Sequence, residues 1–216
     1  MTINTELIVL HTTKFGEDSV VLHTISREYG RRSFLIRKAG KRMSLFLPLN
    51  ILEAEIIESS KSRLFTARSL SPHRNLIGIR NSIYKNAISM FISEVLYRVV
   101  KDEVNEPGLY EWCEKVILLL DAMQNDFSNY HIRFLLELSI VLGFSPDCSR
   151  LQPFAGEQYI ELISRFLESS FEESMLIPMS GAVRNELAEI LLRYIEHHIE
   201  SAVNIRSLKV LREFFQ

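Results

Sequence analysis

Residues 17–42 read EDSVVLHTISREYGRRSFLIRKAGKR, and this stretch determines the fold expected for the N-terminal part of the chain. Two runs within it, VVLHTIS and RSFLIRK, alternate in polarity or are rich in β-branched and aromatic residues, as strands are. Between the runs stand Glu28, Tyr29 and Gly30, and a glycine in such a place is typical of a turn. The stretch therefore predicts a β-hairpin.

The same hairpin is strongly basic. From residue 27 to residue 42 it carries seven Lys or Arg against one acid, Glu28. Such a strip favours phosphate as its partner, so nucleic acid is the expected ligand. The alternative is an edge hairpin whose charges only deter aggregation. The residues expected to bind DNA are Arg27, Tyr29, Arg31, Arg32, Arg37, Lys38, Lys41 and Arg42.

The composition is that of a globular protein. The 216 residues are 47% hydrophobic and 24% charged, and no apolar run reaches the roughly 18 residues that a membrane span needs. The polar N-terminus does not resemble a signal peptide, so we expect a cytoplasmic protein with no membrane partner. Residues 1–74 carry a net charge of +5 and the remainder −7, which suggests a module that meets an anion and a second module with another task.

The N-terminal module is expected to be a small β-barrel. Strand patterns cover residues 5–13, the hairpin, 51–60 and 63–70, with a long loop between the third and fourth strands. Five short strands in this arrangement favour an oligonucleotide-binding (OB) barrel, with an SH3-like barrel as the rival. We therefore expect an α+β protein, with an OB-fold-like nucleic-acid-binding barrel at 1–74 and an all-α domain at 75–216.

Apolar residues recur at helical spacing after Pro72. Pro107 is expected to open one helix and Gly143 to end another. The helices are predicted within 82–103, 110–123, 129–143, 157–170, 180–200 and 205–215.

No catalytic signature stands out. The chain contains no GxxxxGK[ST], GxGxxG, GxSxG or HExxH motif, and its histidines lack the spacing of a helical zinc site. The glutamates of 157–173 could serve a hydrolase, but their spacing is that of a solvated helix face. We expect no enzyme and no cofactor. Of the aromatic residues in the barrel, Tyr29 and Phe46 are best placed to stack on bases, while the others should fill the interior.

Several segments, taken in order, resemble a known family. VLHTTKFGEDSVVLHTISREYGRRSFLIRKAGKR at 9–42, LPLNILEAEI at 47–56, LLELSIVLGFSP at 135–146 and IRSLKVLREFF at 205–215 are similar to the bacterial recombination mediator family RecO. The resemblance implies a DNA repair protein that binds single- and double-stranded DNA and anneals complementary strands. It also implies partnership with RecR and the single-strand binding protein in loading the RecA recombinase.

One departure concerns zinc, because many members of that family carry four zinc-ligating cysteines after the helix end that LGFSP matches. Here Cys148 alone follows Pro146, and position 151 is Leu151. Since tetrahedral zinc needs four ligands, we expect a zinc-free variant.

The helical domain is implied to receive the acidic tail of the single-strand binding protein. Such a ligand needs an apolar slot and a cation for its carboxylate, and Arg133 beside Phe134 is the candidate. The alternative is that Arg133 only pairs with Glu137, four residues on. Two other functions stay open: an RNA-binding barrel of ribosome or tRNA maturation, and a hydrolase in the acidic half.

Overall fold

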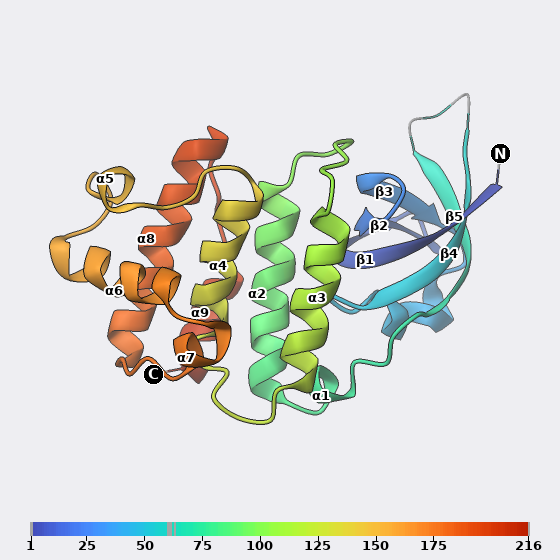
Figure 1. Ribbon diagram of the computed structural model, residues 1–216. Helices are drawn as coiled ribbons and strands as arrows, with labels where there is room; N and C mark the ends of the chain where they lie inside the picture. Colours follow the sequence, from blue (N-terminus) through green and yellow to red (C-terminus); the bar gives the residue numbers. More distant parts are fainter. Residues whose placement is uncertain (1, 60–61, 63, 216) are drawn as a thin grey trace.

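The structure, a computed structural model, describes residues 2–59, 62 and 64–215, and the backbone alone of Lys41. A β-barrel lies at one end of the molecule and the helices extend away from it (Figure 1). The α+β class and the five-stranded barrel followed by helices are confirmed. The strands are β1 (Thr2–Phe15), β2 (Ser19–Ser26), β3 (Gly30–Ile36), β4 (Ile51–Ile57) and β5 (Phe65–Pro72).

The barrel closes in the strand order β1-β2-β3-β5-β4, with β4 returning to β1. Among the strands that the structure describes, only the β3–β5 contact is parallel, and it joins Phe34 to Phe65 and Leu35 to Thr66. β1 is long enough to pair with both β2 and β4, and a bulge between Val9 and His11 changes its register midway. This is the topology of an OB fold, as the strand count and the long third loop indicate.

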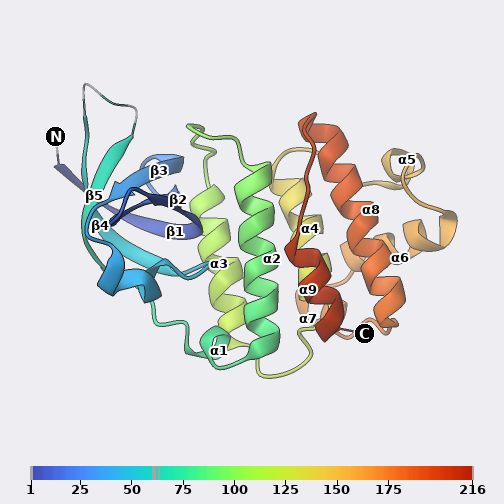
Figure 2. The same ribbon diagram turned by 180° about the vertical axis from the view of Figure 1, so that it is seen from behind.

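The helices form successive layers beside the barrel. α2 and α3 lie against it, α4, α7 and α8 come next, and α5 and α6 lie at the far end (Figures 1 and 2). The helices are α1 (Ile77–Arg80), α2 (Ile83–Val99), α3 (Leu109–Ala122), α4 (Tyr130–Val141), α5 (Cys148–Leu151), α6 (Glu157–Glu168), α7 (Phe171–Met175), α8 (Gly181–Ile199) and α9 (Ser207–Phe214). Among the described residues, no helix is long and apolar enough to cross a membrane.

The sequence patterns miss the short elements. They do not predict α1, α5, α7 or the 3-10 helix η1 (Gly40–Phe46), because one or two turns are too short to show a period. The start predicted for α3 is also wrong by two residues. The helix begins at Leu109 because Gly108, with φ 78°, takes the N-cap position, while Pro107 lies outside. Gly143, with φ 87°, follows the end of α4 as expected.

Two hydrophobic clusters make the core. One fills the barrel, and it includes Leu22, Phe34 and Phe46. The other joins the helices to the outer surface of the barrel, where Ile8 and Ile25 pack with the apolar side of α2. Because large apolar side chains each contribute about 1.5–3 kcal/mol when fully buried, this shared cluster fixes the barrel against the helices.

The loop that follows α2 ties the two halves together through the backbone. Arg31 donates its amide to the carbonyl of Val104 at 3.0 Å, and Glu103 donates its amide to the carbonyl of Arg31 at 2.8 Å. Gly30, with φ 62°, packs directly against the backbone of this loop at Val104 and Asn105. The start of β3 is therefore held by a segment of the helical half.

The carboxylate of Glu94 on α2 anchors α9. It accepts hydrogen bonds from the amides of Arg206 at 3.1 Å and Ser207 at 2.8 Å, and from the Ser207 hydroxyl at 2.5 Å. Burial by itself would raise the pKa of Glu94, but the hydrogen bonds from Ser207 and Arg206 outweigh it and the pKa is lowered. A side chain from another helix thus supplies the cap that α9 lacks locally.

We expect Glu94→Ala to lower the free energy of unfolding by about 1–2 kcal/mol, as the loss of a helix cap does. Hydrogen exchange should show the amides of α9 losing protection before those of α2. Glu186→Ala is the matched control, since Glu186 makes only an exposed 3.7 Å pair with Arg193. Equal exchange of α9 amides in both variants would contradict the role of Glu94.

Candidate nucleic-acid interface

The basic strip of the hairpin does not lie on one surface. Arg27, at the end of β2, points to the helices, where its guanidinium pairs with Glu6 at 2.8 Å and with Glu111 at 2.9 Å. It also lies 3.3 Å from the Glu114 carboxylate and 4.4 Å from the centre of the Tyr110 ring. Three acids surround this one cation, so Arg27 joins the barrel to α3 and is not open to phosphate.

Arg31 is likewise taken into the junction. Its side chain is 5% exposed, its Nη1 lies 3.2 Å from the carboxylate of Asp102, and its guanidinium lies 4.9 Å from the Tyr97 ring centre. Burial lowers the pKa of Arg31, with Asp102 acting in the opposite direction. The side chain is structural in this conformation.

Arg32 and Tyr29 lie at the mouth of the barrel. The Arg32 guanidinium covers the Phe65 ring at 4.0 Å, and Tyr29 meets Phe34 and Phe65 edge-on at 5.9 Å. The Tyr29 hydroxyl donates to Glu58 at 3.0 Å; burial and that carboxylate raise the pKa of Tyr29 to about 12. Tyr29 therefore packs into the barrel mouth, although the sequence places it at an open hairpin tip.

Phe46 is also not available for stacking, contrary to expectation. It is 5% exposed and belongs to the cluster inside the barrel. η1 turns the loop inward, and this places Phe46 against the interior instead of in solvent.

The remaining cations of the strip gather at the end of β3. Arg37 and Lys38 are exposed, and neither makes an ion pair with any residue that the structure describes. Arg42 donates to the carbonyls of Arg37 at 3.0 Å and Lys38 at 3.5 Å, which brings a third positive charge to the same place. The side chain of Lys41 is outside the described part of the chain. We call Arg37, Lys38 and Arg42 the basic end.

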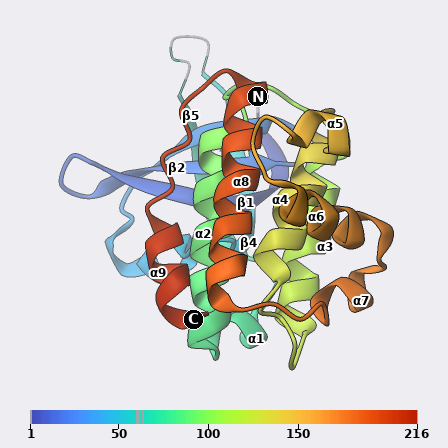
Figure 3. The same ribbon diagram turned by 90° about the vertical axis from the view of Figure 1, so that its left-hand side faces the viewer.

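An open surface leads from the basic end across the outer side of β1, β2 and β3. The register places His11 beside His23 and His23 beside Ser33, and in the next row Thr13, Val21 and Leu35. Figure 3 shows the β1–β2 hairpin projecting past the helices. Phe15, 54% exposed, stands near its tip. We call this surface the β1–β3 face.

Aromatic rings line the inner part of the β1–β3 face. His11 and His23 are stacked with centroids 5.8 Å apart, and Tyr97 of α2 lies 4.9 Å from His11. Burial, with the charge of Arg31, lowers the pKa of His23 to about 4, so its ring is neutral at pH 7. Hydrogen bonds to Thr13 and Ser33 hold that ring in place. Sequence analysis did not single out these two histidines as part of a site. The signal that it missed is that His11 and His23 stand opposite each other on β1 and β2.

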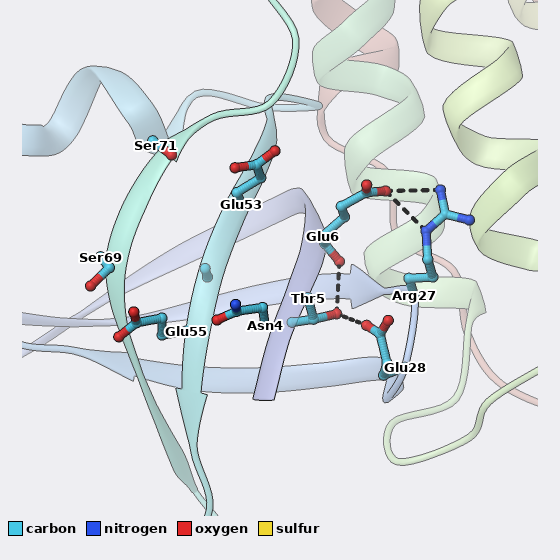
Figure 4. A pocket seen from close by; sticks show the side chains of 10 residues that line it. Asn4, Thr5, Glu6, Arg27, Glu28, Glu53, Glu55, Ser69 and Ser71 are labelled. Atoms are coloured by element: carbon cyan, nitrogen blue, oxygen red, sulfur yellow. Dashed lines mark hydrogen bonds and ion pairs between the residues drawn. The ribbon is translucent and has the colours of Figure 1, made fainter. Parts of the chain in front are cut away.

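The opposite part of the barrel surface is acidic. A hollow of about 370 Å³ lies at β1, β4 and β5. Figure 4 shows the side chains that line it, among them Glu6, Glu28, Glu53 and Glu55. Arg27 reaches into its edge, and Thr5 donates to Glu28. Like charges would repel phosphate from this hollow.

Three potential metal ligands meet near the hollow. Oxygens of Glu6 and Glu114 and a nitrogen of His73 lie within 4.8 Å of one another. However, Arg27 already pairs with both carboxylates, and Arg74 lies 3.6 Å from Glu114. Both carboxylates therefore already have arginine partners. Of the cysteines, Cys113 is buried and Cys148 is exposed.

Arg133 lines a hollow of about 310 Å³ between α3, α4 and α7. Its Nε donates to Glu137 at 2.7 Å, and its Nη1 to the carbonyls of Phe166 at 2.7 Å and Ser169 at 3.1 Å. Arg133 therefore pairs with Glu137, which was one expectation, and also lines a hollow together with Phe134, which was the other. The nearby glutamates of 157–173 are all exposed, as a solvated helix face requires.

Comparison with known proteins agrees with this architecture. Residues 1–75 match the family model for the N-terminal part of Recombination protein O, and residues 80–150 match that for its C-terminal part. A DNA repair protein RecO of Phocaeicola vulgatus is 30% identical over 236 residues, covering 96% of this chain and 97% of its own. One of Flavobacterium johnsoniae is 29% identical over 239 residues, and both chains are fully covered. The chain therefore belongs to the RecO family.

Proposed function

We propose that this chain is a DNA repair and recombination mediator that binds single- and double-stranded DNA and anneals complementary strands. With RecR, it would help to load the RecA recombinase onto DNA coated with the single-strand binding protein. Membership of the RecO family and the DNA repair role in the relatives' names support the general role. The β1–β3 face with its basic end is the observation that carries the DNA-binding part.

The proposed contact has two components. Arg37, Lys38 and Arg42 meet backbone phosphates, which are bound without regard to sequence. Phe15, with its exposed ring, and the stacked His11 and His23 offer surfaces for bases, as single-strand binding barrels do. A surface that combines cations with aromatic rings can hold one strand while its bases stay available for pairing, which annealing requires.

Charge reversal at the basic end tests the proposal. For Arg37→Glu/Lys38→Glu/Arg42→Glu, the slope of log affinity against log salt for a single strand should become shallower by about 2, since each phosphate contact contributes about 0.7. Fluorescence anisotropy of labelled oligothymidine at several salt concentrations measures this slope.

The matched control reverses three exposed charges of the helical half, Arg165→Glu/Arg193→Glu/Lys209→Glu, so both proteins have the same net charge. An equal change in the two triple variants would show that net charge, and not the basic end, governs binding. Competition by a structured RNA against single-stranded DNA tests the alternative of an RNA-binding barrel. Annealing of strands coated with single-strand binding protein, with and without this chain, tests the mediator role.

We propose further that the hollow beside Arg133 receives the acidic tail of the single-strand binding protein. Phe134 and Leu119 offer apolar walls, and Arg133 and Lys115 offer cations for the terminal carboxylate. The geometry limits Arg133, because two of its nitrogens already bind Glu137 and the end of α6. The exposed Lys115 is therefore an added candidate.

Lys115→Glu should weaken binding of a tail peptide by at least about tenfold, since a charge-assisted hydrogen bond contributes about 1.5–3 kcal/mol. Arg133→Ala should do the same, with some loss of stability where α6 ends. Isothermal titration with the peptide measures both variants, and Lys209→Glu is the charge-matched control. If neither substitution changes peptide affinity, the tail does not bind in this hollow.

A further inference from the structure

A second hollow, of about 340 Å³, lies where the barrel, α2 and the segment before α9 meet. Leu10 and His11 of β1 form one wall, and Tyr97 and Arg98 of α2 another. Arg206 and Val210 close the third side. Pockets of this size hold small ligands in many proteins.

Two arginines and one glutamate set the charge of the hollow. Arg98 and Arg206 are both exposed, and neither side chain makes an ion pair within the described part of the chain. The only acid in the lining, Glu94, directs its carboxylate to the amides of Arg206 and Ser207. The Glu94 carboxylate keeps its negative charge and interacts with Arg98, so the two arginines and this acid give the lining a net charge of +1.

Apart from Ser93 and Ser207, the rest of the lining is apolar and aromatic. Leu10 is buried in the wall, Met90 is 44% exposed at the opening, and the rings of His11 and Tyr97 lie 4.9 Å apart. His11 also belongs to the β1–β3 face, so the aromatic row on that face continues into the hollow without a break.

We propose that this hollow binds one nucleotide of the single strand that crosses the β1–β3 face. The base packs against His11 and Tyr97, and the adjoining phosphates lie against Arg98 and Arg206. The inference rests on the proposed function. It states where the bound strand would end, namely at the junction of the barrel with α2 and α9. An acidic peptide would also suit two arginines, but the continuity of the aromatic row with the β1–β3 face favours a nucleotide.

Charge removal tests the phosphate contacts. For Arg98→Gln/Arg206→Gln, affinity for oligothymidine should fall at least several-fold, and the salt slope should become shallower by about 1.4, which corresponds to two phosphates. Arg193→Gln/Lys209→Gln removes the same net charge from exposed sites outside the hollow and should leave both quantities nearly unchanged. Because all four side chains are exposed, the variants should fold with unchanged melting temperature.

Photo-crosslinking tests the position of the base. Oligothymidine containing 4-thiothymidine should crosslink to α2 at Met90, Tyr97 or Arg98, and the Arg98→Gln/Arg206→Gln variant should lose this crosslink. If wild type binds DNA but α2 is never crosslinked and the double variant behaves as its control, the nucleotide site is refuted and the proposed function survives. Loss of acidic-peptide binding in that variant with DNA binding intact would also refute it. If wild type binds no single strand, both proposals fail together.

Discussion

Gly30→Ala should lower the free energy of unfolding by about 3 kcal/mol, because it combines overpacking with an unfavourable backbone conformation. A Cβ at this position would stand 2.3 Å from the carbonyl oxygen of Val104 and 2.5 Å from the Cα of Asn105. Both neighbours are backbone atoms, so neither can rotate away. The loop after α2 would have to move off β3, with loss of the amide hydrogen bonds between Arg31 and that loop.

Gly16→Ala separates the two causes. Gly16 has φ 67°, close to the 62° of Gly30, but nothing lies within 4 Å of its Cβ position. Its substitution should therefore cost only the strain of a non-glycine residue at positive φ, about 1 kcal/mol. Denaturant unfolding measures both variants. Similar losses in the two would mean that contact with Val104 contributes nothing.

Arg27→Met should lower the free energy of unfolding by about 2–3 kcal/mol, since it leaves carboxylates without their charged partner. The Glu6 and Glu114 side chains are 25% and 16% exposed, so water compensates them only in part. Arg68→Met is the matched control, because Arg68 pairs with Glu55 at 2.8 Å on an exposed surface. Such pairs contribute at most about 1 kcal/mol. Equal losses would show that Arg27 is an ordinary surface cation.

The Arg27 effect should depend on pH. Burial raises the pKa of Glu6, but hydrogen bonds from Arg27 and Tyr110, with the charges of Arg27 and His73, outweigh it and the pKa is lowered. A carboxylate with a lowered folded pKa stabilises the protein above its ordinary pKa, and that stabilisation is lost as the pH falls through the folded value. Wild type and Arg27→Met should therefore approach each other in stability in acid. A difference that grew as the pH fell would contradict the assignment.

Local patterns predicted the parts of the fold that depend on local sequence. The 17–42 hairpin followed from two alternating runs and a glycine, and the core-facing helices from apolar spacing. The fate of the basic strip could not follow, because the partners of Arg27 and Arg31, Glu111 and Asp102, lie far along the chain. The basic residues are close together in the sequence, but successive side chains of β3 point to opposite faces of the sheet, so they do not form one surface.

Only the residues of the candidate site that stand out by their charge could be predicted from the sequence. Arg37 and Lys38 are exposed just after β3 and Arg42 lies nearby in η1, and charge alone pointed to them. His11 and Tyr97 could not be predicted, because β1 and α2 are far apart in the sequence and bring these rings together only in the folded protein. Phe46 was wrongly predicted to be exposed, because the sequence of η1 has no periodic pattern that would show that this segment turns into the barrel.

The closed strand order limits how a protein partner can bind this molecule. An open sheet exposes unpaired backbone groups at its margin, and another chain can add a strand there. In the described part of the barrel, β4 pairs with β1 and β5 pairs with β3, so every strand has two neighbours. A partner could add a strand only where this pairing is incomplete, as along β1 beyond Ile8 and along β3 and β5 outside their two paired positions. The same closure reduces the free strand edge through which the barrel could associate with itself.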